Sequence, residues 1–412
     1  MQAVWAASRV LIEENNQSYF IQCGGVQMLL NMLNSTNQGL SIRALLALCC
    51  LITNDQCQKQ LLEAGILSKL MGLLISSSKL LRLHALKIIQ NIGNDARFRS
   101  LLLAENKITQ IADLLSTCSN NDESKSVLDC LVILLKEETI LEQFYNCIGA
   151  IENILSLFIR NQSTDLLLST LSVLYIVIEH EPSRLKSRRI IPFLVDLVSQ
   201  KDTDASVVIQ SLHCLTSFST HASCTSIIQK TNIVFVVSSL LFNSVDDKVK
   251  VHCLQLISSL AKIGNTFAIS LAQSSIPNTL VQLLTATKED SIVRQQVITA
   301  ISWMSSSKQQ QPNQEIVERI LWALSFFSLD QSCQQQIRSS KMGFQFIVTC
   351  LGRDEEITRT LAIKTVLILS GKENRKHLKD AGAIPYLTRL ATSNHRPLQL
   401  ASAKVLSLLL EQ

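Results

Sequence analysis

The sequence predicts an all-α fold built from stacked helical repeats, and three observations support this prediction. A short apolar phrase, with further apolar residues about three or four and seven positions later, recurs nine times in the 412 residues. Hydrophobic residues make up 47% of the chain but aromatic residues only 5%, which favours aliphatic packing between helices. With 6 prolines and 12 glycines, long stretches remain available for helix.

The interval between these phrases is close to 42 residues. Successive starts lie 40, 42, 43, 40, 42, 43, 68 and 40 residues apart. The phrases begin at Val26, Ile66, Ile108, Ile151, Ile191, Ile233, Ile276, Phe344 and Ile384. Helical spacing inside a period of this size is typical of a solenoid, in which each unit packs only on its neighbours.

The second full repeat shows how each unit is expected to fold. Asp55–Glu63 begins with a good capping residue and predicts a short first helix. Ala64-Gly65 predicts a tight turn, because glycine tolerates the backbone angles that such a corner needs. Ile66–Leu74 then predicts a second helix with one apolar stripe, and Leu80–Ile92 a longer third helix.

This triplet resembles the armadillo repeat. The family has an Ala-Gly turn before the second helix and an A-L-x-x-L-x-N-L phrase in the third; here Ala85–Ile92 reads A-L-K-I-I-Q-N-I, and Ala381–Pro385 reads A-G-A-I-P. Turn glycines are expected at Gly25, Gly65, Gly149 and Gly382. They are missing at Lys107, Arg189, Asn232 and Ser275.

The resemblance implies a right-handed superhelical solenoid of about nine to ten three-helix repeats, with third helices lining a concave groove. It covers nearly the whole chain, so residues 1–412 are expected to form a single array. Among armadillo proteins, the irregular repeats of this sequence are most similar to those of ankyrin-armadillo and ciliary armadillo proteins. HEAT repeats, which have two longer helices instead of a triplet, are the alternative.

Two parts of the chain depart from the pattern. Residues 1–25 predict a partial N-terminal repeat, and 399–412 predict a third helix, so we expect the chain to be part of a longer array. The longest interval predicts two third helices, Ile292–Met304 and Ile316–Ser328, separated by a polar loop insertion at 305–314. This insertion is either regulatory or the remnant of a decayed repeat, and residues 315–412 form the C-terminal repeats.

The sequence lacks the motifs of common enzymes. It contains no phosphate-binding loop, dinucleotide fingerprint, nucleophile elbow or H-E-x-x-H motif, so neither an enzyme nor a cofactor is expected. Four potential metal ligands lie close together at His213, Cys214, His221 and Cys224. They lack the tighter pairs of structural zinc sites and predict a packed cysteine and surface histidines instead.

The amino-acid composition limits the cellular compartments and the classes of binding partner that we expect. The net charge of +5 is too weakly basic to indicate nucleic-acid binding. The 12 cysteines form no C-x-x-C pair, and several lie in aliphatic stretches, which fits a reducing compartment. No apolar run is long enough to span a bilayer. We therefore expect a cytoplasmic protein, with the nucleus and the cilium also open.

The third helices predict which side chains face the groove. In importin-alpha relatives, tryptophan and asparagine recur there four residues apart and hold a nuclear-localisation peptide. The corresponding pairs here are Trp5 and Arg9, Leu46 and Cys50, Lys87 and Asn91, Leu171 and Tyr175, His213 and Ser217, Gln255 and Ser259, Trp322 and Phe326, Lys364 and Ile368, and Lys404 and Leu408. No pair holds both family residues, which argues against nuclear import.

Scattered positive charge is the main feature of these positions. Arg9, Lys87, Lys136, Lys364 and Lys404 are basic, and no carboxylate is expected among them. The remaining groove candidates are Asn91 and the aromatic anchors Trp5, Tyr175, Trp322 and Phe326. We expect a non-enzymatic scaffold that binds an extended, acidic peptide or a partner protein, as in beta-catenin-like proteins. The alternative function is an adaptor for small GTPases or cargo. Alternatively, the lysines are ordinary solvated residues of the helices and bind no ligand.

Overall fold

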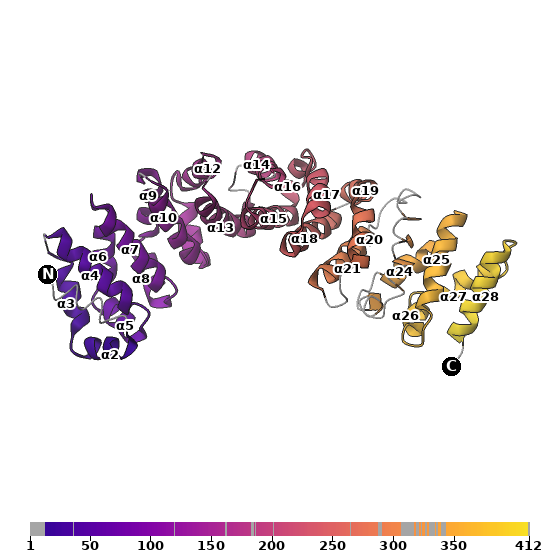
Figure 1. Cartoon of the computed structure of the whole chain (residues 1–412), viewed down its shortest axis with the longest axis horizontal. Coiled ribbons are helices and arrows are strands. Elements are labelled where there is room, and N and C mark those ends of the chain that lie inside the picture. Colours follow the sequence, from indigo (N-terminus) through magenta and orange to yellow (C-terminus); the bar gives the residue numbers. More distant parts are fainter. Residues whose placement is uncertain are drawn as a thin grey trace. The chain divides into compact units, whose positions relative to one another are not determined.

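The described residues form helices and no strands, so the all-α prediction is confirmed. The structure is a computed structural model of the whole chain (Figure 1). It describes residues 13–35, 37–118, 120–160, 163–182, 185, 187–200, 202–263, 265–286, 291–305, 317–318, 321–322, 324–325, 328, 334, 337–338 and 343–410. The chain divides into two compact units, Met1–Lys186 and Ser187–Gln412.

In the first unit, two shorter helices precede each long one. Its helices are α2 (Glu14–Gln22), α3 (Gly25–Met32), α4 (Gln38–Leu51), α5 (Asp55–Glu63), α6 (Ile66–Leu74), α7 (Lys79–Ile92), α8 (Ala96–Ala104), α9 (Ile108–Thr117), α10 (Asn121–Leu134), α11 (Glu138–Tyr145), α12 (Ala150–Arg160) and α13 (Thr164–His180). The long helix α4 packs on α7, α7 on α10, and α10 on α13 (Figure 1). A second row runs from α6 through α9 to α12.

The second unit shows a similar order of helices. They are α14 (Ser187–Ser199), α15 (Ala205–Thr220), α16 (Ala222–Ile228), α17 (Ile233–Asn243), α18 (Asp247–Ile263), α19 (Asn265–Gln273), α20 (Ile276–Ala286), α21 (Ile292–Ser305), α24 (Gly343–Leu351), α25 (Glu356–Leu369), α26 (Arg375–Asp380), α27 (Ala383–Ala391) and α28 (Arg396–Leu410). Within this unit α15 packs on α18, α18 on α21, and α25 on α28.

The local sequence explains where these helices begin and end. Helices α5 and α6 have the predicted bounds, and α7 begins one residue earlier than predicted, at Lys79. The side chain of Asn54 accepts hydrogen bonds from the first backbone N–H groups of α5, which have no partner within the helix. Gly65, with φ of 70°, makes the left-handed turn into α6.

Two predicted turn positions need correction. The left-handed residue before α3 is Gly24, with φ of 79°, and not Gly25. Gly25 is the first residue of that helix, where a Cβ atom would collide with the ring of Phe20. Before α9, where a turn glycine is missing at Lys107, Asn106 adopts φ of 52° instead. Asparagine is among the few residues with a side chain that enter this region readily.

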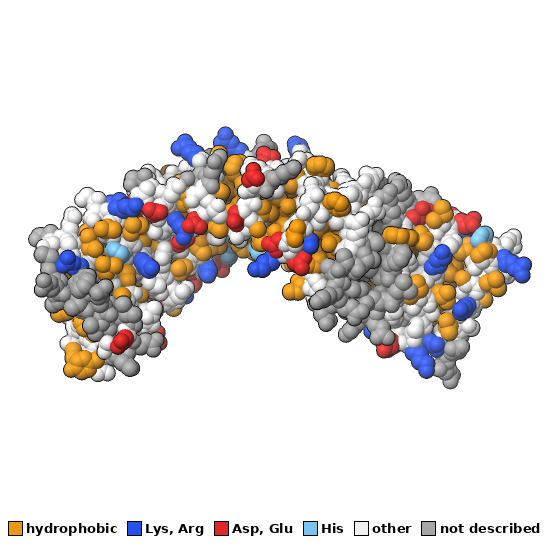
Figure 2. All heavy atoms as spheres, viewed as in Figure 1, with side chains coloured by type: hydrophobic (Ala, Val, Ile, Leu, Met, Phe, Trp, Pro, Cys, Tyr) orange, Lys and Arg blue, Asp and Glu red, His pale blue; other side chains and the backbone are white. Residues whose placement is uncertain are grey.

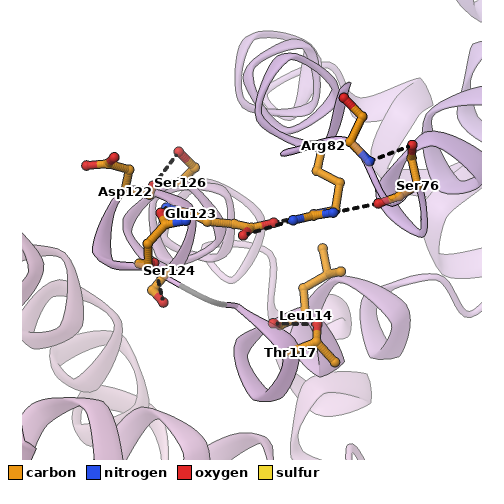
Figure 3. A network of polar contacts seen from close by, with 10 residues as sticks. Ser76, Arg82, Leu114, Thr117, Asp122, Glu123, Ser124 and Ser126 are labelled. Atoms are coloured by element: carbon orange, nitrogen blue, oxygen red, sulfur yellow. Dashed lines mark hydrogen bonds and ion pairs between the residues drawn. The ribbon is translucent and has the colours of Figure 1, made fainter. Parts of the chain in front are cut away.

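An ion pair that the sequence analysis missed joins α7 to α10. Arg82 donates from Nε and Nη2 to the two carboxylate oxygens of Glu123, and from Nη1 to the carbonyl oxygen of Ser76 at 2.6 Å (Figure 3). The side chain of Glu123 is only 3% exposed and that of Arg82 18%. Its hydrogen bond to Glu123 raises the pKa of Arg82. The pair therefore ties two neighbouring long helices together in a partly dry environment.

Other expectations have mixed outcomes. The predicted helix Ile292–Met304 is confirmed as α21, and α28 starts three residues before the predicted Gln399. Of the expected insertion at 305–314, only Ser305 lies within the described residues, and the partial repeat at 1–25 is described from residue 13 onward. Among the described residues, no single helix has the length and apolar character to cross a membrane, whereas α16 and α17 together do, with a bend of 79° between them.

Candidate functional site: a ridge on the long helices

A repeated burial pattern identifies the outward-facing residue of each long helix. In α7, Ala85 and Leu86 are buried, Lys87 is exposed, and Ile88 and Ile89 are buried again. The same pattern of two buried residues, one accessible residue and two buried residues occurs in α4, α10, α13, α15, α18 and α25. Its central residues include Leu46, Lys87, Asp129, Ser172, His213, Gln255 and Lys364; the pattern is also met at Leu168 in α13 and at Thr216 in α15. We call the first seven residues, together with the exposed Lys404 of α28, the ridge residues, and each unit carries its own ridge.

Most predicted groove residues that are described lie on accessible surface. Lys87, Asn91, Lys364 and Lys404 are exposed, and Tyr175 is half-buried. Trp322 is 46% exposed. Lys136 is exposed too, but it lies two residues beyond the end of α10 and not on its ridge. Trp5, Arg9 and Phe326 lie outside the described residues.

Two details of the predicted groove are wrong. Leu171 was expected to face outward, but it is fully buried, and Ser172 takes the ridge position of α13. The ridge also carries a carboxylate, at Asp129 of α10. Its Oδ1 accepts a hydrogen bond of 2.6 Å from Ser169, and its Oδ2 lies 3.5 Å from Nζ of Lys125. The positive charge is therefore interrupted in the first unit.

Lys87 influences two neighbouring titratable groups. Burial lowers the pKa of His84, and the positive charge of Lys87 lowers it further. Burial raises the pKa of the Cys49 thiol to about 11, while Lys87 opposes that rise. The positive charge of Lys87 in α7 therefore acts on a thiol of α4 as well as on a histidine of its own helix.

A second surface with two exposed lysines, Lys364 and Lys404, lies on α25 and α28. These helices pack together, so the two ammonium groups come from neighbouring helices. Ile357, seven residues before Lys364, is 58% exposed, and Leu400, four residues before Lys404, is 63% exposed. The carboxylate of Glu356, next to Ile357, is paired with His395 at 2.7 Å. On the visible face, Lys and Arg side chains are spread among hydrophobic and acidic ones (Figure 2). Lys364, Lys404, Ile357 and Leu400 form what we call the α25–α28 surface.

A cleft of about 720 Å³ beside α17 and α19 is the main alternative site. Phe235, Phe242 and Phe267 line it, together with serine, threonine, asparagine and glutamine side chains. Phe235 and Phe242 are 72% and 63% exposed. Its lining includes no carboxylate, imidazole, amine or thiol, so its serine and threonine hydroxyls have no base among the lining residues to activate them.

The four potential metal ligands around His213 do not converge. Cys214 and Cys224 are buried, whereas His213 and His221 are half-exposed. Among the described residues, no group of three or more His, Cys, Asp or Glu side chains is arranged to hold a metal ion. His213 instead faces His252 of α18, with His213 Nε2 2.9 Å from His252 Nδ1.

Comparisons with known proteins show what this chain is similar to in sequence and in fold. No protein-family model matches the chain. A probable inactive serine/threonine-protein kinase of Dictyostelium discoideum is 40% identical over 446 aligned residues. The match covers 99% of this chain but only 23% of that relative. The crystal structure of an engineered protein from the Northeast Structural Genomics Consortium aligns with this chain at a TM-score of 0.67 and 19% sequence identity. The alignment covers 100% of this chain and 95% of the engineered one. At this identity the structural similarity concerns the fold alone.

Proposed function

We propose that this chain is a non-enzymatic protein-interaction scaffold of the armadillo type, whose α25–α28 surface binds an extended acidic peptide. The observation that carries the proposal is the pair of exposed lysines at Lys364 and Lys404, flanked by the exposed aliphatic residues Ile357 and Leu400. Lysines attract carboxylates or phosphates, and the aliphatic side chains offer contacts to intervening apolar residues.

The armadillo part of the proposal is supported by ties that recur at the repeat interval. Lys69 donates to the carbonyl oxygen of Leu30 at 3.0 Å, and Gln110 donates to that of Met71 at 2.8 Å. Each tie joins residues 39 positions apart and satisfies a carbonyl in the last turn of a short helix. Repetition of one contact in successive units is what an array of equivalent repeats would produce.

The non-enzymatic part is supported by the chemistry of the described surfaces. The lining of the cleft beside α17 holds no acidic or basic side chain, and the ridge lysines are exposed. The name of the Dictyostelium relative, a probable inactive kinase, is consistent with a chain that does not catalyse, although the chain spans only 23% of that protein.

Fluorescence anisotropy with a labelled peptide that alternates glutamate and leucine tests the proposal. The charge-reversing pair Lys364→Glu and Lys404→Glu should weaken binding by roughly tenfold or more, since each exposed charge contact contributes up to about 1 kcal/mol. The matched control reverses Lys230 and Lys248, which are exposed in the same unit but away from this surface. It changes net charge equally and should leave the affinity nearly unchanged.

Equal weakening by both double variants would show that only net charge matters, and unchanged affinity in both would remove this surface as the site. A panel of purified small GTPases provides the second arm. Binding there that is insensitive to Lys364→Glu and Lys404→Glu, with no acidic-peptide binding, would favour the adaptor function.

A further inference from the structure

Two histidines and a glutamine meet between α15 and α18. His213 Nε2 lies 2.9 Å from His252 Nδ1, and the same Nδ1 lies 2.8 Å from Gln255 Oε1. The two imidazole rings are 4.2 Å apart between centroids and inclined at 73°. All three side chains are half-exposed, so solvent and small ions can reach them.

These contacts cannot all be good hydrogen bonds in the neutral protein. Nδ1 of an imidazole offers one in-plane direction, either a lone pair or an N–H. If it accepts from His213, its contact with Gln255 Oε1 joins two acceptors. If it carries the proton, that single proton serves both His213 and Gln255. If the amide of Gln255 is reversed, its NH₂ group and the N–H of His213 both point at the single lone pair of His252 Nδ1. In each arrangement one contact is poorly satisfied.

A cation that accepts electron pairs from all three atoms removes this conflict. We propose that His213 Nε2, His252 Nδ1 and Gln255 Oε1 form a binding site for a divalent transition-metal ion that prefers imidazole, such as Zn²⁺ or Ni²⁺. Water fills the remaining coordination positions.

The spacing of the nitrogens fits such an ion after a small adjustment. Two histidine nitrogens that share a tetrahedral zinc ion, each at about 2.0–2.1 Å, lie roughly 3.3 Å from one another. The observed separation of 2.9 Å needs an outward movement of a few tenths of an ångström, which half-exposed side chains can make. The side chains come from two packed helices, so the helix pair already sets their approximate positions.

Burial separates the proposed ligands from a neighbouring thiol. The side chain of Cys253, next to His252 in α18, is buried, whereas His213 and His252 are half-exposed.

Isothermal titration calorimetry with ZnCl₂ on the full chain tests the site. We expect one ion per chain, and the double variant His213→Gln and His252→Gln should weaken binding by roughly tenfold or more. The control is His180→Gln, an exposed histidine at the end of α13, which should leave the affinity unchanged. Circular dichroism checks that the variants remain folded. Equal affinity in the double variant, or no saturable binding by the native chain, would overturn the proposal.

A second measurement needs no substitution. In the native chain, ¹⁵N-edited NMR of the 7 histidines should show Zn²⁺-dependent shifts of the bound nitrogens in two rings only. The shifted nitrogens should be Nε2 of His213 and Nδ1 of His252. Cobalt(II) provides a check on the donor atoms, because thiolate ligands give an intense charge-transfer absorption. Such a band, or shifts at other histidines, would place the ion elsewhere and contradict the proposal.

Discussion

Replacing Arg82 by methionine should destabilise the first unit by about 3–5 kcal/mol, because it leaves the carboxylate of Glu123 buried without its partner. The variant also loses the hydrogen bond from Arg82 to the carbonyl of Ser76, which contributes about 1 kcal/mol. Methionine retains much of the aliphatic stem, so the loss comes mainly from the removed charge and its hydrogen bonds. A domain stability of roughly 5–15 kcal/mol makes this a large fraction of the total.

The exposed pair between Lys59 and Glu63 of α5 is the matched control. Its atoms are 3.9 Å apart and its side chains are 62% and 64% exposed, so Lys59→Met should cost less than about 1 kcal/mol. A second comparison replaces both members of the buried pair, Arg82→Met with Glu123→Leu. The double variant should regain much of the lost stability, since no buried charge remains.

Urea denaturation followed by circular dichroism measures these changes, and hydrogen exchange of α7 and α10 locates them. Local readout is needed because arrays of helical units do not always unfold in a single step. If Arg82→Met costs no more than Lys59→Met, or if the double variant is less stable than either single one, the pair does not stabilise the α7–α10 contact as described.

Hydrogen bonding to a neighbouring arginine lowers the pKa of Asp95, so its carboxylate stabilises the fold above about pH 4 and loses this effect as the pH falls through the folded pKa. Asp95→Asn should flatten that acid limb in pH-dependent urea melts; an unchanged limb would contradict this. Gly65→Ala should lower the free energy of unfolding by about 1–2 kcal/mol, whereas Asn106→Gly should raise it, because both positions have positive φ. If both substitutions shifted the melting temperature in the same direction, the two turns would not share this geometry. Alkylation with mass-spectrometric readout should label exposed Cys23 before the buried cysteines, and the reverse order would be evidence against the described burial.

The sequence was sufficient for the helices because periodicity and capping agree. The predicted bounds of Asp55–Glu63 and Ile66–Leu74 match α5 and α6, but the residue that caps α5 is Asn54 and not the expected Asp55. The turn at Asn106 could not be read from a missing glycine, because asparagine adopts the same backbone angles through a different side chain.

The site was less predictable, since a helix face depends on rotation by a single residue. Leu171 and Ser172 are neighbours with similar sequence surroundings, yet packing on α10 buries one and leaves the other accessible. Asp129 lies one repeat after Lys87 and could have been found by counting 42 residues. The Arg82–Glu123 and His213–His252 contacts could not, because each depends on which side chains two separate helices bring together.

In the long helices, the residues that could contact a ligand differ from the residues that stabilise the fold. Most ridge residues are accessible side chains between pairs of buried residues, so such a side chain can change while its neighbours keep the helix in place. Along the chain the ridge residues are apolar, basic, acidic, hydroxylic, imidazole and amide in character, and then basic again at Lys364 and Lys404. A substitution at one ridge position would therefore change the ligand preference there and leave the packing of the other helices as it is.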